Sequence, residues 1–187
     1  MLITNDPETQ LFAQFSQNLQ ENYLDKERIW AGSPFEWIQQ KSPSAKGKIR
    51  RRLITKYLTL KGFDVTRSSN RGANMIIAGK LVETKTSSLW KGGIYKFQQL
   101  RDQDYDFVLC LGISPLDVHC WAIPKRVIMD KWYSGEIPSQ HLGQEGIDTA
   151  WLSINPHTPP EWIKEWGGSL AKAVTKIIEI TGHKPLF

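Results

Sequence analysis

Glu83 and Lys85 are the residues whose types and spacing best suit chemistry. They lie two positions apart, so on a β-strand both side chains point to the same face of the sheet. A turn at Ala78-Gly79 would pair Asn74 with Glu83, and directly opposed residues hold their Cβ atoms about 4.5–5.5 Å apart. An amide oxygen, a carboxylate and an ammonium group would then share one small patch.

This set of side chains suits a divalent cation. Mg²⁺ prefers oxygen ligands and keeps several waters, and Glu83 and Asn74 would supply oxygens. Lys85 would stabilise developing charge or help to activate a water. Two charged residues at alternate positions also occur on ordinary solvated strands, so the Glu-x-Lys spacing alone leaves both interpretations open.

The charge of the chain is segregated. The chain has 24 Lys and Arg against 19 Asp and Glu, a net charge of +5. Residues 41–101 hold 15 of these basic residues and only two acids, Asp64 and Glu83. Such a block predicts a surface that binds a polyanion, with a solvated basic surface as the alternative. A carboxylate beside Lys85 within this block is well explained by a metal ion.

Length and composition indicate one globular domain, residues 1–187. The hydrophobic fraction of 40% and the charged fraction of 23% are ordinary for a globular protein. Cys110 and Cys120 lie in apolar runs and are expected to be buried free thiols, and the histidines lack metal-binding spacing. We see no signal peptide and no long apolar run, so we expect a cytoplasmic protein without a membrane partner.

The elements that must position Glu83 and Lys85 are predicted from periodicity, caps and turn residues. Helices are expected over residues 8–23, 33–38 and 45–61, and strands over residues 63–66, 73–77 and 81–86. A helix over 94–102 and strands over 107–113 and 118–123 follow. The remaining elements are a helix over 125–132, a loop over 139–148, a strand over 150–154 and helices over 160–166 and 169–181.

This order predicts an α/β fold with a mixed sheet. We expect a helical N-terminal part (1–45), a core that carries the site (46–125) and a C-terminal part with helices and a strand (126–187). The order, with Glu-x-Lys on the third core strand, resembles the PD-(D/E)xK nuclease superfamily over residues 33–123. The specific parts of the resemblance are the helix ending in Gly62-Phe63-Asp64-Val65, the hairpin, the run from Val82 through Glu83-Thr84-Lys85 to Ser87, and the basic-aromatic helix predicted after it.

Within that superfamily the chain resembles a type II restriction endonuclease. The resemblance implies a restriction-endonuclease-like core, in which helices flank a central mixed β-sheet. It further implies a restriction–modification enzyme that cleaves double-stranded DNA sequence-specifically with Mg²⁺, as a homodimer. Glu83 resembles the second metal-binding acid, the Thr84 carbonyl a backbone ligand, and Lys85 the lysine that assists the attacking water or the scissile phosphate.

Asn74 departs from the family pattern, because it stands where the family has its first metal-binding aspartate. The helix over 45–61 also lacks the glutamate that some members add to the site. Three explanations remain open: an inactivating Asp→Asn change, another acid such as Asp64, or a protein that binds DNA without cutting it.

Candidate DNA contacts are basic or amide side chains of the basic block. Gln98, Gln99 and Arg101 would lie on the predicted helix over 94–102, where Gln and Arg can pair with base edges or phosphates. A solvated helix face is the alternative for these three. The other candidates are Arg51, Arg67, Arg71, Lys91 and Lys96.

Overall fold

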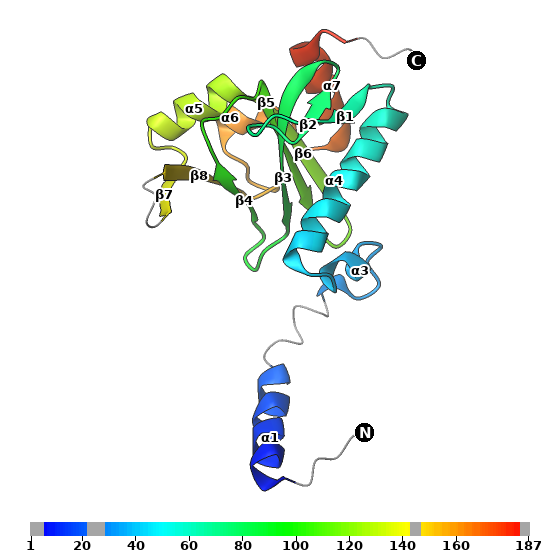
Figure 1. Ribbon diagram of the computed structural model, residues 1–187, viewed down its shortest axis with the longest axis vertical. Helices are drawn as coiled ribbons and strands as arrows, with labels where there is room; N and C mark the ends of the chain where they lie inside the picture. Colours follow the sequence, from blue (N-terminus) through cyan, green and yellow to red (C-terminus); the bar gives the residue numbers. More distant parts are fainter. Residues whose placement is uncertain (1–5, 22–28, 143–146, 184–187) are drawn as a thin grey trace.

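The centre of the protein is a five-stranded mixed sheet. The computed structural model describes residues 6–21, 29–142 and 147–183. The strand order of the central sheet is β1-β2-β3-β5-β6 (Figure 1), and its strands are β1 (Val65–Arg67), β2 (Met75–Ile77), β3 (Lys80–Ser88), β5 (Phe107–Ile113) and β6 (Val118–Pro124). β3 and β5 run parallel, and the other neighbours are antiparallel. The predicted α/β class with a central mixed sheet is confirmed.

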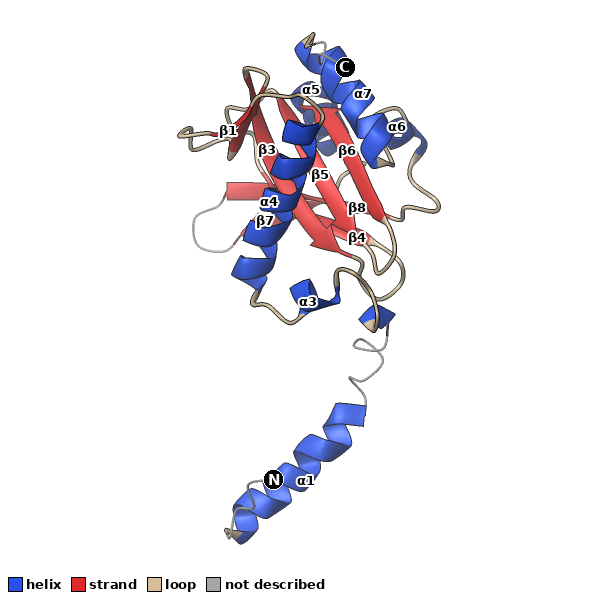
Figure 2. Ribbon diagram, turned by 90° about the vertical axis from the view of Figure 1, so that its right-hand side faces the viewer, coloured by secondary structure: helices blue, strands red, loops and turns tan. Residues whose placement is uncertain are grey.

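Two helices cover one face of this sheet. α4 (Pro43–Leu60) begins after Ser42, whose hydroxyl accepts a hydrogen bond from the Ala45 N–H as an N-cap. Ile54 and Leu58 of α4 and Ile177 of α7 (Leu170–Thr181) pack in one buried cluster with apolar side chains of β3, β5 and β6. Figure 2 shows α4 and α7 lying across the same face of the sheet.

A second, three-stranded sheet covers the other face. It is antiparallel in the order β4-β8-β7, with β4 (Tyr95–Leu100), β7 (Ser139–Leu142) and β8 (Ile147–Ile154). Phe97 and Leu152 from this sheet pack with Cys110 and Trp121 of the central sheet, together with side chains of α5 (Lys125–Tyr133) and α6 (Glu161–Lys164). β5 therefore lies between two layers and is buried at every position, as a strand covered on both faces must be.

The helix predicted over residues 94–102 is wrong, because this segment forms β4. Tyr95 and Phe97 are fully buried, whereas Lys96 between them and Gln98 after them are partly exposed. This alternation has the period of two that a half-buried strand requires. Pairing of Tyr95 with Ile154 and of Phe97 with Leu152 completes the strand.

The C-terminal part contains two strands rather than one. The predicted loop over 139–148 begins with β7, and β8 starts at Ile147, ahead of the predicted strand over 150–154. The sequence Ser-Gln-His-Leu of β7 has no apolar alternation, and its strand conformation depends on pairing with β8. Residues 143–146 of the predicted loop lie outside the described residues.

Within the described residues of the N-terminal part, helices form near the two predicted positions. α1 (Pro7–Glu21) lies apart from the sheets in Figure 1, and the short α3 (Glu36–Gln39) precedes α4. The end of the predicted helix over 8–23 lies outside the described residues. Among the described helices, none combines the length and apolar character that crossing a membrane would require.

Candidate active site

A tight hairpin places Asn74 beside Glu83, as the sequence predicts. The turn residues Ala78 and Gly79 both have positive φ, +46° and +80°, which suits a two-residue hairpin turn. The register pairs Ile77 with Lys80, Ile76 with Leu81 and Met75 with Val82. The next residues outward are Asn74 and Glu83, and the Asn74 Nδ2 lies 3.0 Å from the Glu83 Oε2.

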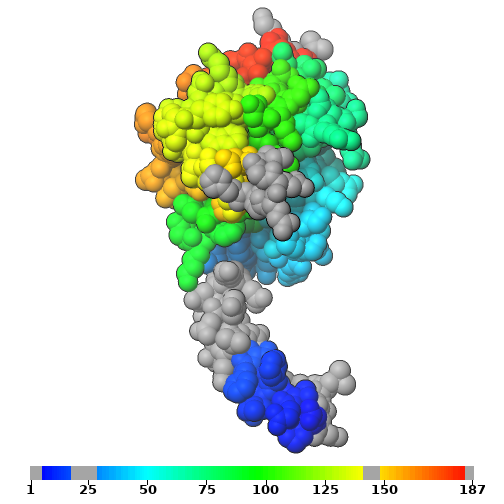
Figure 3. Space-filling view, turned by 60° about the vertical axis from the view of Figure 1, so that its left-hand side comes forward, coloured from blue at the N-terminus to red at the C-terminus, as the bar shows by residue number. Residues whose placement is uncertain are grey.

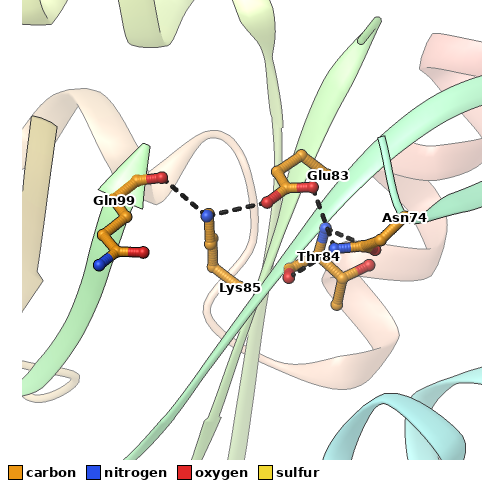
Figure 4. A network of polar contacts seen from close by, with 5 residues as sticks. All are labelled: Asn74, Glu83, Thr84, Lys85 and Gln99. Carbon is orange, nitrogen blue, oxygen red and sulfur yellow. Dashed lines mark hydrogen bonds and ion pairs between the residues drawn. The ribbon is translucent and has the colours of Figure 1, made fainter. Parts of the chain in front are cut away.

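Hydrogen bonds fix the orientation of the Asn74 amide. The Thr84 N–H donates to the Asn74 Oδ1 over 3.1 Å, while the Asn74 Nδ2 donates to the Thr84 carbonyl over 3.2 Å and to Glu83. A flipped amide would set its NH₂ against the Thr84 N–H and its oxygen against two other oxygens, so the hydrogen-bond network excludes it. The amide nitrogen therefore occupies the point where the Glu83 carboxylate and the Thr84 carbonyl converge (Figure 4).

Lys85 lies on the other side of Glu83. Its Nζ is 2.8 Å from the Glu83 Oε1 and donates to the Gln99 carbonyl over 2.7 Å (Figure 4). The two charged side chains are only 19% and 17% exposed, respectively. Solvent screens such a pair less than a surface ion pair. Both oxygens of Glu83 thus have a donor: the ammonium of Lys85 and the amide of Asn74.

The Lys85 contact depends on an irregularity in β4. The pairing of β4 with β8 shifts between Phe97 and Leu100, and Gln99 within this bulge has a φ of +58°. Bulges re-aim backbone groups near functional sites, and a left-handed conformation is unfavourable for a residue with a Cβ. The strained residue turns its carbonyl toward Lys85.

Glu83 and Lys85 lie on the face of β3 that points toward the second sheet. Leu81, two residues before Glu83, packs against the cluster formed with that sheet, whereas Val82 packs in the cluster formed with α4 and α7. α4 therefore lies on the face of the sheet opposite to Glu83 and Lys85. Its Arg50 is buried and donates a hydrogen bond to the Ser88 hydroxyl at the end of β3, and burial lowers the pKa of Arg50 to about 10. Arg50 of α4 therefore has a packing role.

Asp64 is too far along the sheet to complete the site. Its carbonyl accepts the Ala78 N–H at the turn end of the hairpin, and the next residue, Val65, pairs with Ile77. By this register, the position opposite Asn74 lies four residues after Asp64. Four strand residues span about 13 Å, so the Asp64 alternative is not supported by the register.

The donor atoms fit a hard cation only in part. Glu83 and the Thr84 carbonyl supply two oxygens that converge, which suits Mg²⁺. The third group is the Asn74 NH₂, a donor that cannot ligate a cation. Among the described residues, no group of three or more His, Cys, Asp or Glu could hold a metal ion. Glu83 and Thr84 fit the ion, and Asn74 does so only if its amide turns around.

The predicted DNA contacts do not form a single surface. Gln99 reaches Lys85 through its carbonyl, and Arg71 is exposed in the loop between β1 and β2, just before Asn74. Arg67 pairs with Met75, so its side chain lies on the α4 face of β1, and Arg51 is on α4 itself. Lys96 and Gln98 lie on β4 and Arg101 directly follows it, so none of the three lies on a helix. Lys91 lies in the connection between β3 and β4.

Tyr105 beside the site was missed by the sequence reasoning. Its hydroxyl is buried and has no hydrogen-bond partner among the described residues. Burial raises the pKa of Tyr105, and the negative charges of Asp102 and Glu83 raise it further. The only signal in the sequence is a tyrosine shortly before the apolar strand β5, which by itself is typical of a core residue.

Comparisons with known proteins add little. No protein-family model matches the chain, and no curated protein matches its sequence. One structure with a similar chain path is that of the bacterial homing endonuclease I-Ssp6803I. It is 17% identical, the match covers 72% of this chain and 93% of that chain, and the TM-score is 0.45. The proposal below therefore rests on the residues of this chain.

Proposed function

We propose that this chain is a DNA endonuclease of the restriction type, which hydrolyses phosphodiester bonds of double-stranded DNA with Mg²⁺. The observation that carries the proposal is the convergence of the Glu83 carboxylate, the Thr84 carbonyl and the Lys85 ammonium on one partly buried patch. This patch lies within a block of 15 basic and two acidic residues, where a polyanion is attracted.

Glu83 and the Thr84 carbonyl would hold the ion, together with an oxygen at position 74. A bound Mg²⁺ lowers the pKa of its water and offsets charge on the phosphate. The Lys85 Nζ has three protons, and its contacts with Glu83 and Gln99 within the described part of the chain leave one for a phosphate oxygen or a water. The Gln99 carbonyl and Glu83 hold the ammonium in place, which reduces the entropy lost when substrate binds.

Asn74 should lower the metal affinity and the cleavage rate of this enzyme. Turning its amide to present Oδ1 to an ion gives up the bond from the Thr84 N–H and the two bonds that Nδ2 donates. At about 1 kcal/mol for each hydrogen bond, the cost is about 3 kcal/mol. An asparagine oxygen also brings no negative charge. We therefore expect weak metal binding and slow cleavage.

The second candidate function is DNA binding without cleavage. The specific observation in its favour is that the Asn74 NH₂ already satisfies the two oxygens that an ion would need. In either case the expected partner is double-stranded DNA in the cytoplasm. Cleavage of a palindromic site would require a two-fold homodimer.

The proposal is tested by cleavage of supercoiled plasmid in Mg²⁺ and in Mn²⁺. We expect slow cutting by the parent chain, and a loss of about 10²–10³-fold in Glu83→Ala and in Lys85→Ala, because each removes a charge at the reacting centre. Glu161→Ala and Lys164→Ala, which disrupt an exposed ion pair far from Glu83 in the sequence, are the controls. Cleavage by Glu83→Ala at the parent rate would show that the site lies elsewhere.

A further inference from the structure

The connection between β3 and β4, residues 89–94, forms a tip that projects from the body (Figure 1). The Trp90 N–H donates to the Ile94 carbonyl over 2.8 Å, and the Gly93 N–H donates to the Trp90 carbonyl over 3.1 Å. Gly92 and Gly93 have φ of +93° and +73°, which glycine adopts readily. At the base of the tip, the Leu89 N–H donates to the Ile113 carbonyl over 2.9 Å. The tip is therefore closed and anchored.

Trp90 is exposed at this tip, although the adjacent Leu89 is partly buried. Leu89 packs against the core between the two sheets, whereas Trp90 keeps 49% of its surface in solvent. The Lys96 Nζ lies 4.5 Å from the centre of the indole ring. The ammonium and the partly exposed indole therefore form a cation–π contact, so a positive charge and an aromatic surface share one site.

The charge around Trp90 favours nucleic acid over an apolar partner. From Leu89 to Phe97 the chain contains Lys91 and Lys96 and no acidic residue. Aromatic side chains interleaved with cations are the recurring means by which proteins stack on unpaired bases while neutralising the backbone. In Figure 3 the green atoms of this part of the chain stand out at the lower edge of the body.

The tip lies at a usable distance from the candidate active site, because β3 runs directly from Lys85 toward Trp90. Five residues of strand span about 17 Å, and each phosphate of one strand of duplex DNA adds about 3.4 Å along the helix axis. A duplex with a phosphate at Lys85 and its axis along β3 would therefore bring a base about five pairs away to Trp90.

We infer that Trp90 is a base-stacking residue, which takes an unstacked nucleobase of the bound DNA while Lys91 contacts the adjacent phosphate. The inference rests on the proposed function for its ligand, DNA, but does not require that the DNA be cut. It assigns a binding role to a residue outside the Glu83–Lys85 patch. It also implies that DNA with an unpaired base is bound more tightly than fully paired DNA.

The test measures DNA binding in EDTA, where metal-dependent cleavage cannot contribute. The probes are two fluorescein-labelled duplexes of one sequence, one fully paired and one with a central unpaired loop of three nucleotides, followed by fluorescence anisotropy. We expect Trp90→Leu to weaken binding of the looped duplex roughly 5- to 150-fold, the range for loss of one stacked base. Trp90→Phe keeps an aromatic face and should retain most of the affinity.

Trp37→Leu is the matched control, because Trp37 is 48% exposed and lies outside the tip. Parent-like binding of the looped duplex by Trp90→Leu, or an equal loss in Trp37→Leu, would overturn the inference. So would a change in oligomeric state in Trp90→Leu, measured by analytical ultracentrifugation, with unchanged DNA affinity, because the tip would then bind a second copy. A parent chain that binds DNA but never cuts it would defeat the proposed function and leave the Trp90 inference standing.

Discussion

The Gln99 carbonyl accepts a hydrogen bond from the Lys85 Nζ over 2.7 Å, and Gln99 makes this contact from a left-handed backbone conformation with φ of +58°. The side chain of Gln99 is exposed, so its backbone carries the relationship. A residue with a Cβ adopts this conformation at a cost of about 1–2 kcal/mol. The bulge therefore lowers the stability of the fold while it holds the Lys85 ammonium against Glu83.

Substitutions at Gln99 should separate backbone conformation from side-chain chemistry. Gln99→Gly relieves the strain, and we expect it to preserve the Lys85 contact and leave the free energy of unfolding unchanged or higher. Gln99→Val, whose branched Cβ disfavours a positive φ, should lower that free energy by about 1–2 kcal/mol and free the lysine. The measurements are urea unfolding and the rate at which an amine-acylating reagent modifies Lys85, read by peptide mass spectrometry.

Gln98→Val is the control for this pair, because Gln98 precedes the strained residue and has no positive φ. It should leave the Lys85 acylation rate at the parent value. Equal acylation rates in Gln99→Val and the parent would mean that the Gln99 carbonyl does not hold the lysine.

The difference between Asn74 and Gln99 shows what sequence reasoning can reach. Asn74 and Glu83 are joined by a two-residue turn, and apolar residues flank it, so counting outward from Ala78-Gly79 gives the correct register. The Gln99 contact depends on a bulge and on pairing of β4 with β8, more than 45 residues later in the chain. No local pattern encodes such a contact.

The same reason explains the error at β4. Tyr95 and Phe97 alternate with polar residues, which is a strand pattern, but a run this short is ambiguous between strand and helix. Its partner β8 decides between them, and β8 itself was only partly predicted. The apolar run of β5 was predicted with its observed bounds, because a strand buried on both faces is a nearly continuous run of apolar residues.

DNA binding should depend strongly on salt. If five to eight phosphates are contacted, log K should fall with log salt at about −0.9 for each contact, because bound cations displace condensed counterions. Neutralising Arg71, which is exposed in the loop just before Asn74, should reduce the slope by about 0.9. The same change at Lys164 and Lys172, which lie outside the basic block, should leave it unaltered, and a parent slope near zero would remove the electrostatic argument.

Acid should weaken the fold through His119. Its Nδ1 lies 2.9 Å from the Tyr95 hydroxyl, its ring stacks on Trp121, and burial lowers its pKa below the ordinary 6.5. The unfolded chain therefore binds more protons below about pH 6.5, so the free energy of unfolding falls as the pH drops through the folded pKa.

Chemical denaturation at pH 7.5 and at pH 5.5 measures this effect of His119. The loss of stability between the two pH values should be smaller in His119→Gln than in the parent. His157→Gln, at an exposed histidine, should show a slightly smaller loss than the parent, because a charge on His157 also disfavours protonation of His119. An identical loss in the parent and in His119→Gln would show that other groups cause the acid sensitivity.

Asn74→Asp should create a metal site and raise cleavage. The substitution replaces the NH₂ that lies 3.0 Å from the Glu83 Oε2 and 3.2 Å from the Thr84 carbonyl by an oxygen, so that three oxygens converge. Without an ion, two carboxylates this close repel each other, and the protein should be less stable than the parent. A divalent cation relieves the repulsion, and removing the cost of turning the amide alone should strengthen binding about 100-fold.

Two readouts examine this change at position 74 independently. Thermal unfolding with and without Ca²⁺ should show a rise in the melting temperature for Asn74→Asp and little change for the parent, because an ion that binds only the folded state stabilises it. Plasmid cleavage in Mg²⁺ should be faster for Asn74→Asp. Robust cutting by the parent, unimproved by the substitution, would mean that the Asn74 amide turns readily or that another group completes the site. Inactivity of both forms, with Ca²⁺ and DNA bound, would favour the protein that binds DNA without cutting it.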